Sequence, residues 1–373
     1  MQYSQLSVVK HRVRAGAPLP FNVRNADTTL LLARGHRVDS AAQLEALFSR
    51  GALVDIAELR SPRAEVEEAA PERLPALWGL CMNRVGDTLR ASTQDNFAGA
   101  LEEAAEPVLS LIERDADLAI FQVLRQDAND RTEYGVTHSV HAAITSFLVT
   151  QRLGWDEAST QKVFKAALTM NLSMLELQGQ LANQTSPLTL RQREEIHSHP
   201  QRSVAMLELS GVRDRDWLDA VAQHHEVPDG WGYPAKLKEV GDMASMLRRA
   251  DIYTAKLSGR ANRDAVAANL AGRQMFQQEP GHPMTAALVK EFGVYPPGCY
   301  VMLVSGEMGV VVKRGPTVTT PIVAALTNAR AAPLPEPVRR DTSQREHAIA
   351  GVLGDKAVRV RVAPERLMAL SLA

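Results

Sequence analysis

The stretch HHEVPDGWGYP, at residues 224–234 of the 373-residue chain, is the most informative part of the sequence. Two adjacent histidines, His224 and His225, close an apolar helical pattern, and a run rich in glycine and proline follows them. Glycine tolerates the backbone of a sharp bend, and Pro234 cannot continue a helix. The stretch therefore predicts a pair of imidazoles beside a tight loop. Taken alone, it is also compatible with a structural turn whose histidines are solvated.

Helical periodicity extends on both sides of this stretch, from Leu77 to about Phe292. Apolar residues recur at helical spacing, for example at Val108, Leu111 and Ile112. Most interruptions carry residues that start or stop helices. We expect a helical domain of eight or more helices at residues 77–292.

The beginning of the chain has a mixed pattern. Residues 1–60 predict a small α+β module in which Asp39 or Ser40 caps a helix that stops at Gly51. A stretch rich in Glu, Ala and Pro follows, and it predicts a linker at residues 61–76.

The end of the chain changes character again after Gly293. Residues 300–304 and 309–312 predict a β-hairpin, and alternating valines predict a further strand at residues 357–362. Residues 293–373 therefore predict a β-containing extension. The expected fold class is mainly α, with a small α+β module before the helical domain and a small β-containing segment after it.

Composition excludes several classes of protein. The formal net charge of −1 gives no electrostatic basis for binding a nucleic acid polymer or a membrane surface. The two cysteines, Cys81 and Cys299, lie far apart and predict a reducing compartment without disulfides. No apolar run approaches the roughly 20 residues that span a bilayer. We expect a cytoplasmic protein.

The eleven residues at 224–234 resemble the HHExxDGxGYP signature of HD-GYP domains, the family of cyclic-di-GMP phosphodiesterases. Other landmarks of the family follow in order: His138-Ser139 early on a helix, His199-Pro200 after a helical turn, and an Ala-Asp-x-Tyr sequence at residues 250–253. The resemblance covers about residues 110–325. It implies a helical HD-GYP-like domain.

The resemblance also implies roles for individual residues. In active members of the family, imidazoles and carboxylates gather two or three divalent metals, usually iron or manganese. The matching positions here are His138, His199, His224, His225 and Asp251. Arg260 and Arg263 match basic residues that face the substrate phosphates. The GYP loop comprises Asp229, Gly230, Trp231, Gly232, Tyr233 and Pro234.

The central His-Asp pair of the family is replaced in this chain. Met170 and Asn171 stand at its two positions, and Met174 stands where the family has a lysine. A glutamate that active relatives carry before the first histidine falls at Tyr134. A thioether is a poor ligand for hard divalent iron or manganese, and an amide has no charge with which to bridge two metal ions. We expect no bi- or trinuclear centre.

Two alternatives remain for the metal. One is a single divalent ion, Fe, Mn or Zn, held by His199, His224 and His225, because three imidazoles and a water are a common zinc arrangement. The other is no metal, with these residues making ordinary hydrogen bonds.

Three functions follow, in order of preference. The first is a non-catalytic cyclic-di-GMP sensor or protein-interaction scaffold, and not an efficient enzyme. The second is a weak metal-dependent cyclic-di-GMP phosphodiesterase with a reduced metal site. The third is a docking module without nucleotide binding, whose partner is a protein such as a diguanylate cyclase domain and whose anchor is Trp231.

Overall fold

The computed structural model describes residues 2–59, 62–93, 96–125, 133–360, 362–363, 366–367 and 370. The chain divides into two compact units, residues 1–68 and residues 69–373. The boundaries expected at residues 60, 76 and 292 remain predictions. Among the described helices, none has both the length and the apolar character that crossing a bilayer requires.

The first unit is a small α+β module. Its four-stranded antiparallel sheet has the order β1-β4-β2-β3, and its elements are β1 (Tyr3–Gln5), η1 (Leu6–Arg12), β2 (Val23–Arg24), β3 (Leu30–Leu32), α1 (Ala41–Ser49), β4 (Leu53–Asp55), α2 (Ile56–Leu59) and α3 (Pro62–Glu68). Ser40 caps α1 by accepting a hydrogen bond from the Gln43 amide at 3.2 Å. Gly51 follows α1 with φ of 65°. The capped helix predicted here is confirmed.

Part of the stretch expected to be a linker is helical. Helix α3 occupies Pro62–Glu68, and a short 3-10 turn, η2 (Pro71–Arg73), leads directly into the next helix. Proline is well tolerated in the first turn of a helix, and Ala and Glu favour its continuation. The composition that suggested a flexible linker is therefore equally that of a short helix.

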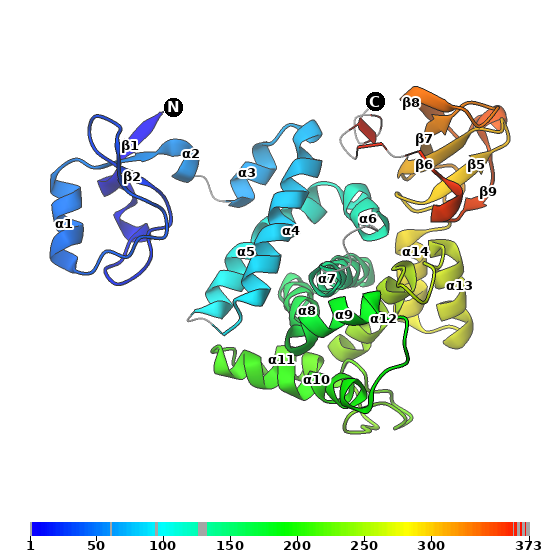
Figure 1. Ribbon diagram of the computed structural model, residues 1–373, viewed down its shortest axis with the longest axis horizontal. Helices are drawn as coiled ribbons and strands as arrows, with labels where there is room; N and C mark the ends of the chain where they lie inside the picture. The colour runs from blue at the N-terminus through cyan, green and yellow to red at the C-terminus, as the bar shows by residue number, and fades with distance from the viewer. Residues whose placement is uncertain are drawn as a thin grey trace. The chain divides into compact units, whose positions relative to one another are not determined.

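The second unit contains eleven α-helices within its described residues, in agreement with the prediction. They are α4 (Leu74–Arg90), α5 (Phe97–Arg114), α6 (Ala116–Leu124), α7 (Tyr134–Leu153), α8 (Glu157–Thr169), α9 (Leu175–Asn183), α10 (Leu190–Leu209), α11 (Arg215–Gln223), α12 (Asp242–Leu257), α13 (Ala268–Gln278) and α14 (Pro283–Phe292), with a 3-10 turn η3 (Leu172–Met174) before α9. Helix α7 is buried along nearly its whole length and packs against α4, α6, α8, α9, α12 and α14 (Figure 1).

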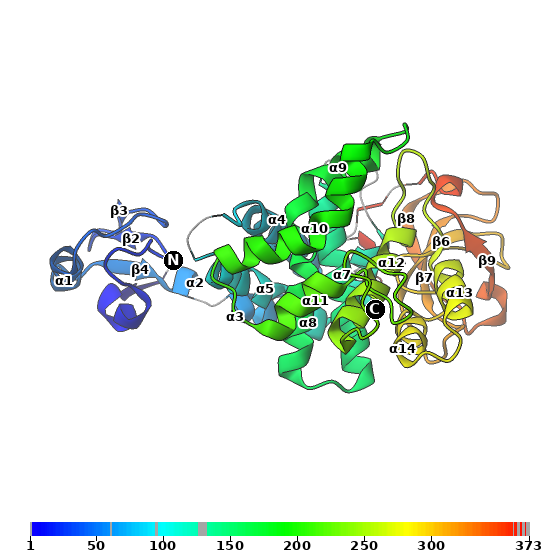
Figure 2. The ribbon, with the colours of Figure 1, turned by 90° about the horizontal axis from the view of Figure 1, so that it is seen from below.

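A five-stranded antiparallel sheet follows the helices. Its order is β8-β7-β6-β5-β9, and its strands are β5 (Tyr300–Leu303), β6 (Met308–Lys313), β7 (Ile322–Thr327), β8 (Pro333–Asp341) and β9 (Ile349–Leu353), with 3-10 turns η4 (Arg345–His347) and η5 (Asp355–Ala357). Figure 2 shows this sheet beside α13 and α14. The hairpin predicted from residues 300–312 is confirmed as β5 and β6.

The strand predicted at residues 357–362 is wrong for the residues that the structure describes. Residues 358–360 are in no strand, and Arg361 lies outside the described residues. Val358 is buried, and Val360 and Val362 pack against the sheet's core without joining its hydrogen-bond ladder. Their alternation thus reflects burial of every second side chain, a pattern that does not require a paired strand.

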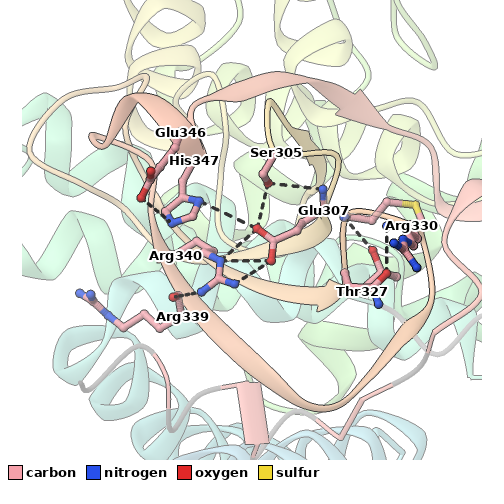
Figure 3. Close-up of polar contacts among 10 residues, drawn as sticks. Ser305, Glu307, Thr327, Arg330, Arg339, Arg340, Glu346 and His347 are labelled. Carbon is pink, nitrogen blue, oxygen red and sulfur yellow. Dashed lines mark hydrogen bonds and ion pairs between the residues drawn. The ribbon is translucent and has the colours of Figure 1, made fainter.

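An ion-pair network ties the β5–β6 turn to the edge strand β8 (Figure 3). Glu307 is 6% exposed and accepts hydrogen bonds from Arg340 at 2.7 and 3.0 Å and from the Ser305 hydroxyl at 2.9 Å. His347 lies 3.9 Å from the same carboxylate. The hydrogen bonds from Arg340 hold the pKa of Glu307 below its usual range. The buried carboxylate of Glu307 thereby links the β5–β6 turn to residues of β8 and η4 that are distant in sequence.

A second network joins the sheet to the helices. Arg314, just after β6, pairs with Asp117 of α6 and with Glu291 of α14, the latter at 2.9 Å. Glu291 also pairs with Arg152 of α7. One nearly buried carboxylate therefore serves two arginines from different elements.

Replacing Glu291 by alanine is expected to destabilise the protein by about 2 kcal/mol, because two arginines lose a shared buried partner yet remain partly exposed to water. The measurement is the midpoint of urea unfolding. Glu336→Ala is the matched control, because its pair with Arg366 lies on the surface, with side chains 69% and 60% exposed. Equal shifts for the two variants would contradict the assignment of a structural role to Glu291.

Candidate metal centre

Three histidines meet where α10 passes the end of α11. His199 lies in the middle of α10, His224 is the C-cap residue directly after α11, and His225 follows it. We call them the imidazole triad. One potential ligand atom from each lies within 4.8 Å of the others, and the Nε2 atoms of His199 and His224 are 3.1 Å apart. In the structure, His224 and His225 therefore lie beside the loop, where the sequence pattern predicts them.

Backbone carbonyls set the tautomers of two of these rings. His199 Nδ1 lies 2.6 Å from the Ile196 carbonyl, and His224 Nδ1 lies 2.7 Å from the Val221 carbonyl. A carbonyl oxygen only accepts, so each Nδ1 carries the proton and each Nε2 presents a lone pair. Metal-binding histidines commonly donate their other ring N–H in this way.

Burial keeps the triad neutral. It lowers the pKa of His199 to about 3, assisted by the neighbouring His224. Burial also lowers the pKa of His224 and holds that of His225 well below its usual range. Two lone pairs that face each other at 3.1 Å repel, and a divalent cation between them removes the repulsion. The donor set therefore fits one divalent transition metal.

The other predicted ligands form a pair of their own. His138 of α7 places Nε2 at 2.7 Å from Asp251 Oδ1 of α12. The carboxylate accepts, so His138 Nε2 holds the proton, and that nitrogen offers no lone pair to a metal. Burial alone would raise the pKa of Asp251, but the hydrogen bond and charge of His138 hold it well below the usual range. The charge of Asp251 also acts on the pKa of all three triad histidines, so the pair adjoins the triad.

Tyr134 and Arg260 cover this pair. The Tyr134 ring stacks on His138, with centroids 5.6 Å apart and planes 7° apart. Arg260 lies over the same tyrosine ring and donates to its hydroxyl at 3.0 Å. Where the resemblance implies a carboxylate, an aromatic ring and a guanidinium are found.

The segment with Met170 and Asn171 lies against α10. The Ser173 amide donates to the Ser203 hydroxyl at 3.1 Å, and the Ser173 hydroxyl donates to the His199 carbonyl at 3.0 Å. Met170 and Asn171 are buried, and neither amide atom of Asn171 has a hydrogen-bond partner among the described residues. The assignment of Met170, Asn171 and Met174 to the His-Asp and Lys positions of the family remains a prediction, which this proximity to His199 supports.

The GYP loop is shaped by one glutamate and one glycine. Buried Glu226 accepts from three backbone amides: Ala235 at 2.6 Å, Leu237 at 3.0 Å and Lys236 at 3.1 Å. A Cβ on Gly232 would lie 2.5 Å from the Glu226 Cα, so only glycine allows this approach.

Two aromatic residues of the loop have opposite environments. Trp231 is 88% exposed, as expected for a surface anchor. The Tyr233 ring stacks on His225, with centroids 4.5 Å apart, and burial raises the pKa of its hydroxyl. The loop therefore presents an apolar side chain to solvent and turns a phenol toward the triad.

The predicted phosphate-binding arginines differ from each other. Arg260 is placed at the site through Tyr134, whereas the Arg263 guanidinium donates to the Ala255 carbonyl. Sequence reasoning missed Arg202, which follows His199 by three residues on α10 and whose charge helps to lower the pKa of that histidine. It is exposed, and no ion pair to it is found among the described residues. The helical spacing from His199 was the signal that could have found it.

Comparisons with known proteins identify relatives of this chain. Residues 122–281 match the family model of the HD domain. Over 227 residues the chain is 29% identical to the cyclic di-GMP phosphodiesterase PA4108 of Pseudomonas aeruginosa, covering 59% of this chain and 54% of that protein. The match thus spans about half the length of that relative.

A solved structure supports the fold. The HDG"Y"P protein Bd1817 of Bdellovibrio bacteriovorus matches with a TM-score of 0.51, covering 78% of this chain and 98% of that chain at 16% identity. Together with the imidazole triad and the GYP loop, these matches confirm the resemblance to HD-GYP proteins, and residues 122–281 of this chain match the HD domain family.

Proposed function

We propose that this protein is a cyclic-di-GMP signalling protein that binds the nucleotide at its HD domain and does not turn it over efficiently. The observation that carries the proposal is the pair of His138 and Asp251 at 2.7 Å, and the uncharged, buried Asn171 adds to it. An imidazole that donates to a carboxylate and an amide without charge make a poor second metal site. Efficient hydrolysis of a phosphodiester by clustered metal ions needs such a site.

The triad of His199, His224 and His225 would hold one divalent ion. A bound ion there would act as a Lewis acid and neutralise part of the phosphate charge. The chain's own residues orient the imidazoles through backbone carbonyls. Arg260 and Arg202 add positive charge at the edge of the site, which favours an anionic nucleotide.

Two other functions have particular support. A weak cyclic-di-GMP phosphodiesterase is supported by the triad itself, because three imidazoles leave a coordination position for water. A docking module for a protein such as a diguanylate cyclase domain is supported by the exposure of Trp231, since aromatic residues are favoured as interface anchors. We rank both below the nucleotide sensor.

The test is incubation of the purified protein with cyclic-di-GMP and manganese, or anaerobically with iron(II), combined with calorimetric binding. Saturable binding with the nucleotide recovered intact is the expected result. Linear dinucleotide or GMP that disappears with His224→Ala would establish the weak phosphodiesterase instead. If the protein neither binds nor cleaves the nucleotide, the docking module is the function that remains.

Replacing Arg202 by glutamine is expected to weaken nucleotide binding about tenfold, the effect of losing one solvent-exposed charged contact. The salt dependence of binding should also fall, because one positive charge is lost near the phosphates. Arg191→Gln, on the same helix but paired with Glu195, is the matched control. Equal affinities of the Arg202→Gln variant and the wild-type protein would remove Arg202 from the site.

A further inference from the structure

His197 is an exposed residue whose ring nevertheless contacts the site. It lies two residues before His199 on α10 and stacks on Tyr233, with centroids 5.2 Å apart and planes 24° apart. Tyr233 in turn stacks on His225, with centroids 4.5 Å apart and planes 19° apart. A continuous aromatic stack therefore runs from the surface of α10, through the GYP loop, to the triad.

This stack reaches the least constrained histidine of the triad. His199 and His224 each have a ring nitrogen tied to a backbone carbonyl of their own helix. Among the described residues, the His225 ring makes no such bond, and His225 lies just beyond the end of α11. The His225 ring contacts the rings of His199 and His224, and stacking on Tyr233 is the contact from outside the triad that can set its orientation.

Tyr233 itself depends on the loop. Its amide donates to the His225 carbonyl at a long 3.3 Å, and Glu226 anchors the chain only after Pro234, at residues 235–237. The phenol ring between these anchors is held by packing, and His197 is a packing partner supplied by a rigid helix.

We propose that His197 is a positioning residue that holds Tyr233 against His225 and so orients the third imidazole of the triad. The proposal deepens the proposed metal site and rests on it for its functional consequence. Stacking needs an aromatic ring at position 197 and not a titratable group, so phenylalanine should replace histidine there without loss.

The first measurement does not involve metal. Hydrogen exchange of the amides at residues 226–237 is followed by mass spectrometry in the wild type, His197→Ala and His197→Phe. One aromatic pair shifts a local opening equilibrium roughly fivefold. We expect exchange about fivefold faster in His197→Ala and near the wild-type rate in His197→Phe.

The second measurement is titration with cobalt(II), whose visible absorption reports its coordination geometry. Loss of a residue that orients a ligand typically weakens metal binding about tenfold or more. His197→Ala should bind cobalt(II) about tenfold more weakly with an altered spectrum, and His197→Phe should restore both.

The controls separate the possible failures. Arg193→Ala changes another exposed residue one turn earlier on α10 and should alter neither measurement. Unchanged loop exchange in His197→Ala would overturn the positioning role. A wild-type protein that binds no cobalt(II) would overturn the proposed metal site, while loop exchange would still decide whether His197 positions Tyr233. Weaker cobalt(II) binding in both His197 variants would show that the imidazole, and not stacking, matters, which also overturns the proposal.

Discussion

Zinc binding is expected to fall at least about 100-fold when His224 is replaced by alanine, because even residues that only orient a ligand contribute 10- to 100-fold. His224 Nε2 faces His199 Nε2 at 3.1 Å, and both Nδ1 protons are committed to carbonyls. Removing one ring takes away one of the three neutral donors of the triad. His199→Ala should have an effect of the same size.

The measurement is calorimetric titration with zinc, supported by thermal unfolding. A ligand at 100 times its dissociation constant stabilises the folded state by about 2.7 kcal/mol, so zinc should raise the wild-type unfolding temperature and leave that of His224→Ala unchanged. His36→Ala is the matched control, since His36 is an exposed histidine of the first unit. If His224→Ala keeps the wild-type affinity for zinc, the triad is not the metal site.

Replacing Gly135 by alanine is expected to destabilise the protein by about 2 kcal/mol, as overpacking of a tight interior does. Gly135 lies in the first turn of α7, three residues before His138. A Cβ there would lie 2.3 Å from the Leu175 carbonyl oxygen and 2.9 Å from the Leu175 Cα. Both atoms belong to the backbone of α9, so one helix must move.

Gly79→Ala is the matched control for this variant. Gly79 is an exposed glycine within α4, and a Cβ there meets nothing within 4 Å. Alanine should stabilise that helix by about 0.5–1 kcal/mol, because glycine is a poor helix former. Urea unfolding should thus shift in opposite directions for the two substitutions. A shift in the same direction would show that close packing against α9 is not what Gly135 provides.

Much of the fold could be predicted because its signals are local. The helix after Ser40, the β5–β6 hairpin and the helical character of residues 77–292 all depend on periodicity and on capping or turn residues. The string at residues 224–234 predicted the imidazoles beside a loop for the same reason. The false strand prediction at residues 357–362 could not be avoided in this way. Val358, Val360 and Val362 have the alternation of a strand only because each packs against the core of the sheet.

The candidate site was less accessible to sequence reasoning. The resemblance named five metal-binding positions. It could not predict that His138 donates to Asp251, which separates the five residues into a pair and a triad. That arrangement depends on the distance between α7 and α12, which tertiary packing sets. Arg202 and His197 were missed because each looks like an ordinary exposed helix residue until its neighbours are known.

The outer strand β8 has one further consequence. Prolines at 333, 335 and 337 occupy alternate positions along it, and proline has no amide hydrogen to donate. Alternate residues of a strand point their backbone groups in the same direction, so one side of β8 is poor in donors. The backbone carbonyls of a neighbouring strand at this border would have few amide hydrogens from which to accept hydrogen bonds. The part of β8 at residues 333–337 is therefore a poor template for an added strand, which disfavours growth of the sheet at that border.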